Sequence, residues 1–137
     1  MYVNPKIDAV INDIKINKKS VPSSLSYFFR GYLLQQREPE LNPFNIPIIF
    51  ECGWNLDETS KLLDFLYDMG IKSFIFADAS TACLRTLSSM LSDSKYSVSI
   101  TQSYTWNIVN FGYTDKRYGV VVELKKKRKQ YKNPSLI

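Results

Sequence analysis

The sequence predicts an α/β domain in which two N-terminal helices pack on a sheet that ends in an antiparallel hairpin. Three observations predict this class. Apolar residues recur at helical spacing through residues 7–33. Strand and helix patterns alternate through residues 46–101, and residues 104–113 and 118–125 both have strand patterns. The length of 137 residues fits one domain, so we expect residues 1–137 to fold together.

Local signals place the two N-terminal helices. Asn4 before Pro5 is a typical helix start, and the apolar spacing that follows predicts a helix of about three turns. A second helix is expected from about Ser23, with Phe28 and Tyr32 on its aromatic face. We expect this face to cover the sheet, and the alternative is an exposed patch for a partner.

The centre of the chain predicts a β-α-β-α-β unit, which implies a parallel sheet. Asn55 with Glu58 resembles a capping box that opens the first helix of the unit, and Gly70 is placed to end it. The expected strands are residues 46–52, 72–77 and 96–101. The strands at 104–113 and 118–125 should then form a C-terminal antiparallel hairpin, joined by a turn at residues 114–117.

The net charge of +5 is concentrated at one end of the sequence. Of the 18 basic residues, six lie within residues 125–137, and all 13 acidic residues precede them. Residues 1–124 therefore carry 12 − 13 = −1. This asymmetry predicts a local electrostatic contact site rather than a basic face spread over the fold.

Several classes of function are excluded by composition. The chain has no histidine, which removes Ser-His-Asp and Cys-His catalysis and histidine-ligated zinc. Its two cysteines lack CxxC spacing, and its five glycines never form a phosphate-binding loop. No apolar run approaches the ~20 residues of a membrane span, and the first residues lack the order of a secretion signal. We therefore expect a cytoplasmic protein without a membrane contact, or a nuclear one in a cell with a nucleus.

The basic C-terminal segment, residues 125–137, is the first candidate site. Its cations can contact phosphates, and an aromatic ring among them can stack on a base. The run of residues 125–129 also resembles a short nuclear-import signal. Alternatives are recognition by a protein, simple solvation, or protection of an edge strand. The predicted nucleic-acid-binding residues are Lys125, Lys126, Lys127, Arg128, Lys129, Tyr131 and Lys132.

Two acids after strand ends are a second candidate site. Glu51 and Asp78 should meet at the carboxyl edge of the sheet, where carboxylates can hold Mg²⁺. The topology of residues 46–102 resembles metal-dependent nucleases of the PIN and NYN kind, without a matching signature, so the resemblance assigns no residue roles. Asn55, Asp78 and Ser80 are equally explained as helix caps.

A third candidate combines Asp115 with Glu123 and Lys125. An acid followed by Glu-x-Lys on a strand resembles the PD-(D/E)xK nucleases, in which the acids ligate a metal and the lysine supports the attacking water. Asp115 is not preceded by proline as the motif requires, and aspartate is also favoured in a hairpin turn. The alternative is a solvated edge strand.

From these features we expect a small, non-enzymatic protein that contacts nucleic acid through its basic C-terminal segment, as a monomer or a homodimer. One alternative is an interaction or inhibitor module that binds a protein through an edge strand or the aromatic helix. The other is a metal-dependent nuclease, the only case in which a cofactor, Mg²⁺, is expected.

Overall fold

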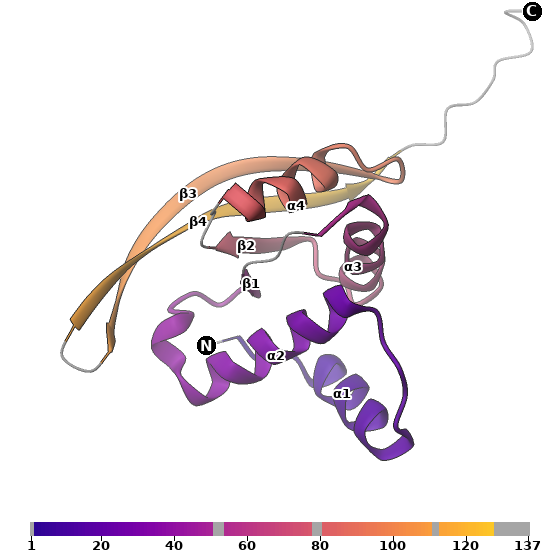
Figure 1. Ribbon diagram of the computed structural model, residues 1–137, viewed down its shortest axis with the longest axis horizontal. Helices are drawn as coiled ribbons and strands as arrows, with labels where there is room; N and C mark the ends of the chain where they lie inside the picture. Colours follow the sequence, from indigo (N-terminus) through magenta and orange to yellow (C-terminus); the bar gives the residue numbers. More distant parts are fainter. Residues whose placement is uncertain (1, 51–53, 78–80, 111–112, 128–137) are drawn as a thin grey trace, which may run out of the picture.

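The computed structural model describes residues 2–50, 54–77, 81–110 and 113–127. Within these ranges the chain forms four α-helices, a short 3-10 helix and a four-stranded mixed sheet (Figure 1). The prediction of a mixed α/β fold is thereby confirmed. The helices are α1 (Pro5–Asn17), α2 (Ser23–Arg37), η1 (Pro39–Leu41), α3 (Leu56–Asp68) and α4 (Thr81–Leu91). The strands are β1 (Ile48–Phe50), β2 (Ser73–Ala77), β3 (Tyr96–Asn110) and β4 (Tyr113–Lys126).

The helix ends form where the sequence predicts them. The Asn4 side chain accepts a hydrogen bond from the Lys6 amide at 3.0 Å, which caps α1. The Asn55 side chain accepts one from the Glu58 amide at 2.9 Å and caps α3. Gly70 follows α3 with a φ of 76°, a left-handed conformation that costs glycine little.

The sheet differs from the prediction in the order of its strands. The order is β1-β2-β4-β3, with β1 parallel to β2 and β4 antiparallel to both of its neighbours. The strands β1, β2 and β3 therefore run in the same direction, as the β-α-β-α-β pattern implies. They are not three adjacent strands, however, because β4 lies between β2 and β3. The antiparallel pairing of β4 with β2 stands where a parallel pairing of β2 and β3 was expected, whereas the antiparallel hairpin of β3 and β4 was itself expected.

The hairpin is also longer than the sequence indicates. The two segments expected as separate strands, residues 96–101 and 104–113, are largely one strand, β3, with an irregularity in pairing between Ile100 and Gln102. The turn predicted at residues 114–117 is instead part of β4, and pairing extends to Asn110 with Tyr113. Polar residues suggested a turn there, but a strand that projects into solvent accepts polar side chains equally well.

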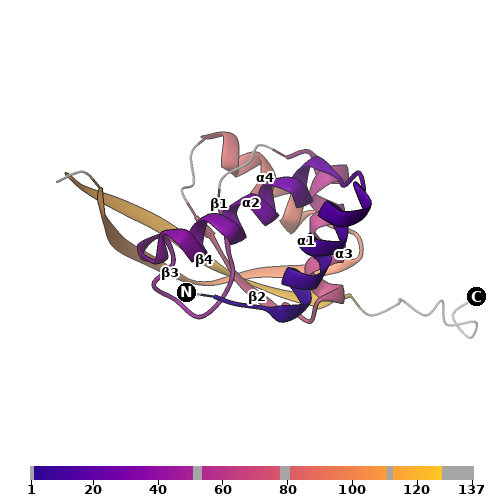
Figure 2. The ribbon, with the colours of Figure 1, turned by 90° about the horizontal axis from the view of Figure 1, so that it is seen from below.

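The helices cover one face of the sheet (Figure 2). From the sheet, Phe74, Phe76 and Val122 enter the main core, and all three are fully buried. From the helices, Leu62, Leu63, Leu66 and Met90 meet them with no exposed surface. Burial of each such side chain contributes about 1.5–3 kcal/mol, so this layer makes a large favourable contribution to the stability of the fold.

The segment that follows α2 covers part of the opposite face and forms a second core there. Leu41, Phe44 and Ile46 pack there on Ile75 and Trp106. The Phe44 ring meets the Trp106 ring edge-on, with 5.4 Å between centroids. The hairpin continues past the ends of β1 and β2, and we call residues 105–110 and 113–118 the hairpin arm (Figure 1).

A buried polar network holds the covering segment in place. Asn42 is completely buried, and its amide donates to the Gln35 side chain at 2.7 Å and to the Ile46 carbonyl at 2.9 Å. Its side-chain oxygen accepts from the Phe44 amide at 2.9 Å. Gln35 in turn donates to the Tyr2 carbonyl at 2.5 Å. The network therefore connects the N-terminal residues, α2 and the segment over the second face.

Gly119 sits where β4 crosses the second core, and we predict that Gly119→Ala destabilises the fold. An added Cβ would lie 2.7 Å from Cγ2 of Ile75 and 3.2 Å from the Trp106 ring. Overpacking of this kind costs about 1–3 kcal/mol. Urea unfolding should show the loss, with Thr114→Ala on the exposed arm as the control. Equal midpoints for Gly119→Ala and the wild type would show that the strands can separate to accept the methyl group.

Candidate nucleic-acid interface

Five lysines from three strand ends lie together at one end of the sheet. Lys125 and Lys126 close β4, where they pair with Ser97 and Tyr96 of β3. The Lys127 amide donates to the Lys95 carbonyl at 2.8 Å, and the Leu124 amide donates to the Lys72 carbonyl at 2.8 Å. All five lysine side chains are exposed. We call Lys72, Lys95, Lys125, Lys126 and Lys127 the cationic end.

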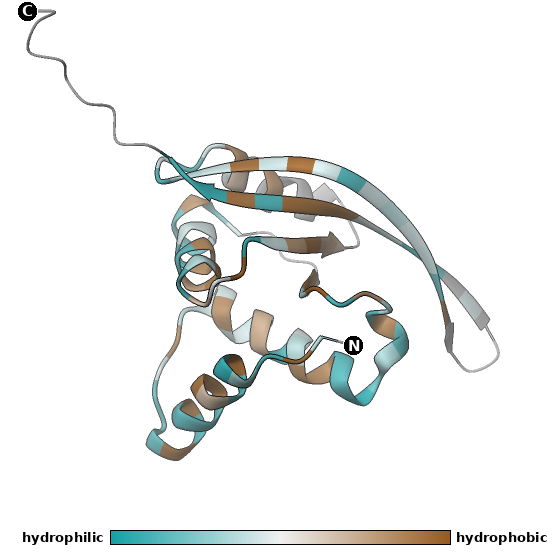
Figure 3. Cartoon of the chain, turned by 180° about the vertical axis from the view of Figure 1, so that it is seen from behind, coloured by the Kyte–Doolittle hydropathy of each residue, from teal (hydrophilic) through white to brown (hydrophobic). Residues whose placement is uncertain are grey.

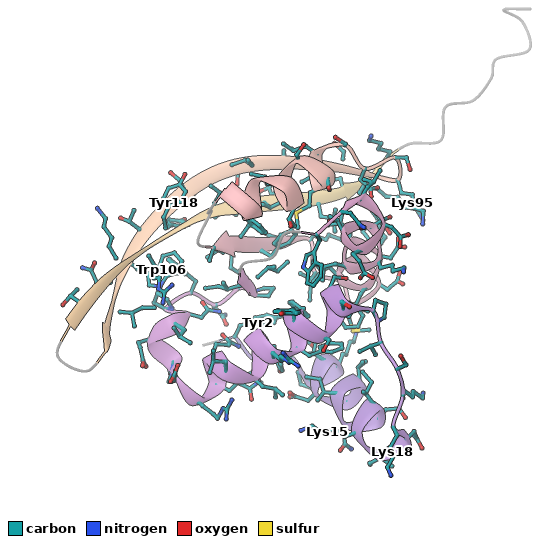
Figure 4. All side chains as sticks on the ribbon, viewed as in Figure 1. Tyr2, Lys15, Lys18, Lys95, Trp106 and Tyr118 are labelled. Atoms are coloured by element: carbon teal, nitrogen blue, oxygen red, sulfur yellow. The ribbon has the colours of Figure 1, made fainter. Side chains whose placement is uncertain are left out.

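Hydropathy and side chains show the position of the cationic end. Along β4 the hydrophobic centre gives way to hydrophilic residues at the carboxyl end (Figure 3). Lys95 lies at that end of the sheet, far from Lys15 and Lys18 of the α1 region (Figure 4). Lys72 and Lys95 were not among the predicted site residues, because more than twenty residues of sequence separate each of them from the other lysines of the cationic end. Only the strand register brings them beside Lys125.

Contacts within the domain hold three of these side chains. The Lys127 ammonium donates to the Asp93 carbonyl at 2.6 Å. Lys95 forms an ion pair with Asp64 at 3.3 Å, and the Lys126 ammonium lies 5.8 Å from the centre of the Tyr67 ring. Lys127 therefore fixes the exit of the chain from β4 in addition to contributing charge.

The acids near the cationic end have structural partners. Asp93 is 2% exposed, and its carboxylate accepts from the amides of Lys95 and Tyr96 at 2.8 and 3.0 Å. The Asp64 carboxylate accepts from the Tyr96 hydroxyl at 2.6 Å. Burial, and then the nearby Asp64, raise the pKa of Tyr96 far above its usual value. These contacts build the turn that presents the lysines.

Trp106 and Tyr104, two aromatic residues on β3, have contacts within the domain. Trp106 is only 9% exposed and belongs to the second core, while Tyr104 is 37% exposed and lies against Phe44. At the cationic end itself the rings are Tyr67 and Tyr96, whose centroids are 5.4 Å apart. Of the predicted binding residues, the structure describes Lys125, Lys126 and Lys127. Arg128, Lys129, Tyr131 and Lys132 lie outside the described residues.

The acids expected at the sheet edge, Glu51 and Asp78, also lie outside the described residues, as does Ser80. The residues before the two acids, Phe50 and Ala77, are paired neighbours on β1 and β2. Asn55 acts as a helix cap, as its alternative interpretation predicts. Among the residues whose placement is described, no group of three metal-binding side chains is present.

The other acidic candidate is spread along one strand. Asp115 and Glu123 both belong to β4 and are eight residues apart, which corresponds to about 26 Å at the usual rise of a strand. Two carboxylates that bind one cation must bring their oxygens within about 5 Å of each other. The Asp115 position on β4 is therefore too far from Glu123 and Lys125 for the three residues to form one metal site. Glu123 instead lies half-buried between Ser73 and Ser99.

The aromatic face of α2 belongs to the core. Phe28, Phe29 and Tyr32 are 3%, 7% and 2% exposed, and both phenylalanine rings contact Phe65 of α3. This helix therefore presents no aromatic patch of these three rings to a partner.

Comparison with known proteins gives no relative. No family model matches the chain, and neither a curated protein nor a solved structure matches it. In the described part of the chain, no helix is both long and apolar enough to cross a membrane. The functional argument therefore depends on the geometry of this molecule alone.

The raised pKa of Tyr96 predicts how stability depends on pH. Unfolded tyrosine loses its proton near pH 10, whereas folded Tyr96 keeps it, so the free energy of unfolding should fall above about pH 10. One proton changes this slope by at most about 1.4 kcal/mol per pH unit. In Tyr96→Phe the decline should be correspondingly shallower, measured by urea unfolding between about pH 9 and 11. The exposed Tyr118→Phe is the control, and parallel wild-type and Tyr96→Phe curves would contradict the prediction.

Proposed function

We propose that this protein binds nucleic acid through phosphate contacts made by its cationic end and by the basic segment that follows it. The observation that supports the proposal is the register of β2, β3 and β4, which gathers five exposed lysines at one end of the sheet. The sequence adds Arg128, Lys129 and Lys132 within five residues after Lys127. Eight cations therefore belong to the proposed interface.

The chemistry of these residues indicates contact with the backbone of a nucleic acid rather than reading of its bases. Lysine is a compact point charge on a flexible stem, and it binds phosphate without the two-pronged geometry that arginine offers to guanine. Phosphate contacts fix position and affinity but carry no sequence information. We therefore propose binding of low sequence preference that weakens as salt rises.

The proposed role is contact without a reaction or a cofactor, inside the cell. Asp64 and Asp93, two acids near the lysines, are engaged in hydrogen bonds that shape the turn. Lys127 holds the turn to β4, so the basic segment starts from a fixed point. A fixed start limits the conformational entropy that the first lysines lose on binding.

A salt series on full-length protein tests the proposal. Binding of short mixed-sequence duplex DNA is measured by fluorescence anisotropy between about 50 and 200 mM salt. Each lysine that contacts a phosphate contributes about 0.9 to the slope of log affinity against log salt. The double variant Lys125→Gln/Lys126→Gln should therefore lower the slope by up to about 1.8 and weaken binding at low salt.

The matched control is Lys15→Gln/Lys18→Gln, which removes the same charge at the far side of the molecule (Figure 4). Both control lysines are exposed, so neither pair is expected to alter the fold. An equal loss of affinity in the two double variants would mean that net charge, and not the cationic end, drives binding. Wild-type protein that does not bind DNA or RNA at low salt would overturn the proposal.

A further inference from the structure

The outer strand of the sheet is long and open. In the described part of the chain, β3 pairs with β4 on one side and has no strand on its other side. It has 15 residues, whereas an average strand has about five or six. The strand at the other edge, β1, has three residues and follows Pro47. Shortness and proline are common protections of an edge strand, and β3 has neither.

Apart from the irregularity in pairing between Ile100 and Gln102, β3 carries none of the residues that usually protect an edge strand. Residues 96–114 form the longest uncharged run of the chain, and β3 contains no proline and no glycine. At the overall charged fraction of 23%, a segment of 15 residues would hold about three charges (0.23 × 15). On the other strand of the arm, Asp115, Lys116 and Arg117 follow one another. In the hairpin, the β4 edge therefore carries charges that oppose pairing with another strand, whereas the β3 edge carries none.

The strand register shows which backbone groups of β3 face outward. The Leu124 amide donates to the Lys72 carbonyl, so it points toward β2. Backbone direction alternates along a strand, so Val120, Tyr118 and Lys116 point to that same side. Their partners on β3 then direct their amides and carbonyls away from β4. These partners are Ser103, Thr105 and Asn107.

Exposed apolar surface adjoins this open edge. Ile100, Tyr104 and Tyr118 are 46%, 37% and 46% exposed. Between α4 and the hairpin lies a groove of about 520 Å³, lined by Leu87 and Val120 together with Ile100 and Tyr118. Tyr118 lies on the hairpin (Figure 4). A strand added to β3 would cover part of this surface as well as the backbone groups.

We propose that β3 pairs with β3 of a second copy of this chain, antiparallel and around a two-fold axis. In such an interface the same strand forms both sides, and a charged residue near the two-fold axis would face the same residue of the other copy, a like charge. An uncharged strand suits this arrangement in a way that few other surfaces of this protein do. The two helix-covered faces lie on the same side of the joined sheet, which brings the two grooves together.

The distribution of charge also favours a second copy. If the two-fold axis passes near Thr105, Tyr96 lies nine residues away on each side. The two cationic ends are then about 60 Å apart at the usual strand rise, beyond the range of electrostatic repulsion in physiological salt. One strand and a groove form less than a standard interface of about 800 Å² per partner. We therefore expect a reversible dimer whose population depends on concentration.

Sedimentation equilibrium of the full-length protein over a range of concentrations tests the inference. The wild type should pass from 15.9 kDa toward twice that mass as concentration rises. Asn107→Pro removes an outward amide from β3 without removing a bond to β4, and should raise the dissociation constant about tenfold or more. Thr105→Lys, which keeps every backbone group, should weaken the dimer as well.

The matched control is Lys116→Pro. Lys116 is the direct cross-strand partner of Asn107, and its amide faces the opposite edge of the ribbon. Circular dichroism establishes that each variant is folded, and the control should dimerise like the wild type. A wild type that stays monomeric, a larger assembly, or equal effects of the two proline variants would each overturn the inference. Because none of these measurements involves nucleic acid, the outcome is separate from that of the proposed function.

Discussion

The position of β4 between β2 and β3 is the constraint on which the rest of the structure depends. β4 forms backbone hydrogen bonds with both of its neighbours, β2 and β3, and its side chains enter both cores. Gly119 permits this crossing because Ile75 and Trp106 occupy the space where a side chain would lie. The arm, the open edge of β3 and the gathering of lysines all follow from this one placement.

Local features of the fold could be predicted from the sequence because they depend on neighbouring residues. Asn4, Asn55 and Gly70 determine helix ends through contacts within one turn, and apolar spacing indicates which helix faces are buried. The strand order could not be predicted. Nothing in the pattern of β4 distinguishes pairing with β2 from a place at the outer edge, since both leave the same alternation of side chains.

The candidate sites show the same difference between local features, which the sequence indicates, and long-range contacts, which it does not. A run of lysines is visible in the sequence, but Lys72 and Lys95 join it only through strand pairing. Asp115 and Glu123 suggested a shared centre because an acid followed by Glu-x-Lys resembles a nuclease pattern, whereas one extended strand keeps the two positions apart. Trp106 gave no sign of burial, because its packing against Phe44 depends on a segment some sixty residues earlier.

The pairing of β2 with β4 also determines the order in which the molecule can be completed. Ser73 pairs with Glu123, fifty residues later in the chain. During synthesis, one side of β2 therefore waits without its partner until residues 119–123 have been made. Over that interval Phe74 and Phe76 have helices available to cover them, but their backbone groups do not have their final hydrogen bonds. Long-range pairing of this kind makes folding slow, and the nascent chain must avoid joining β2 to the uncharged strand that precedes β4.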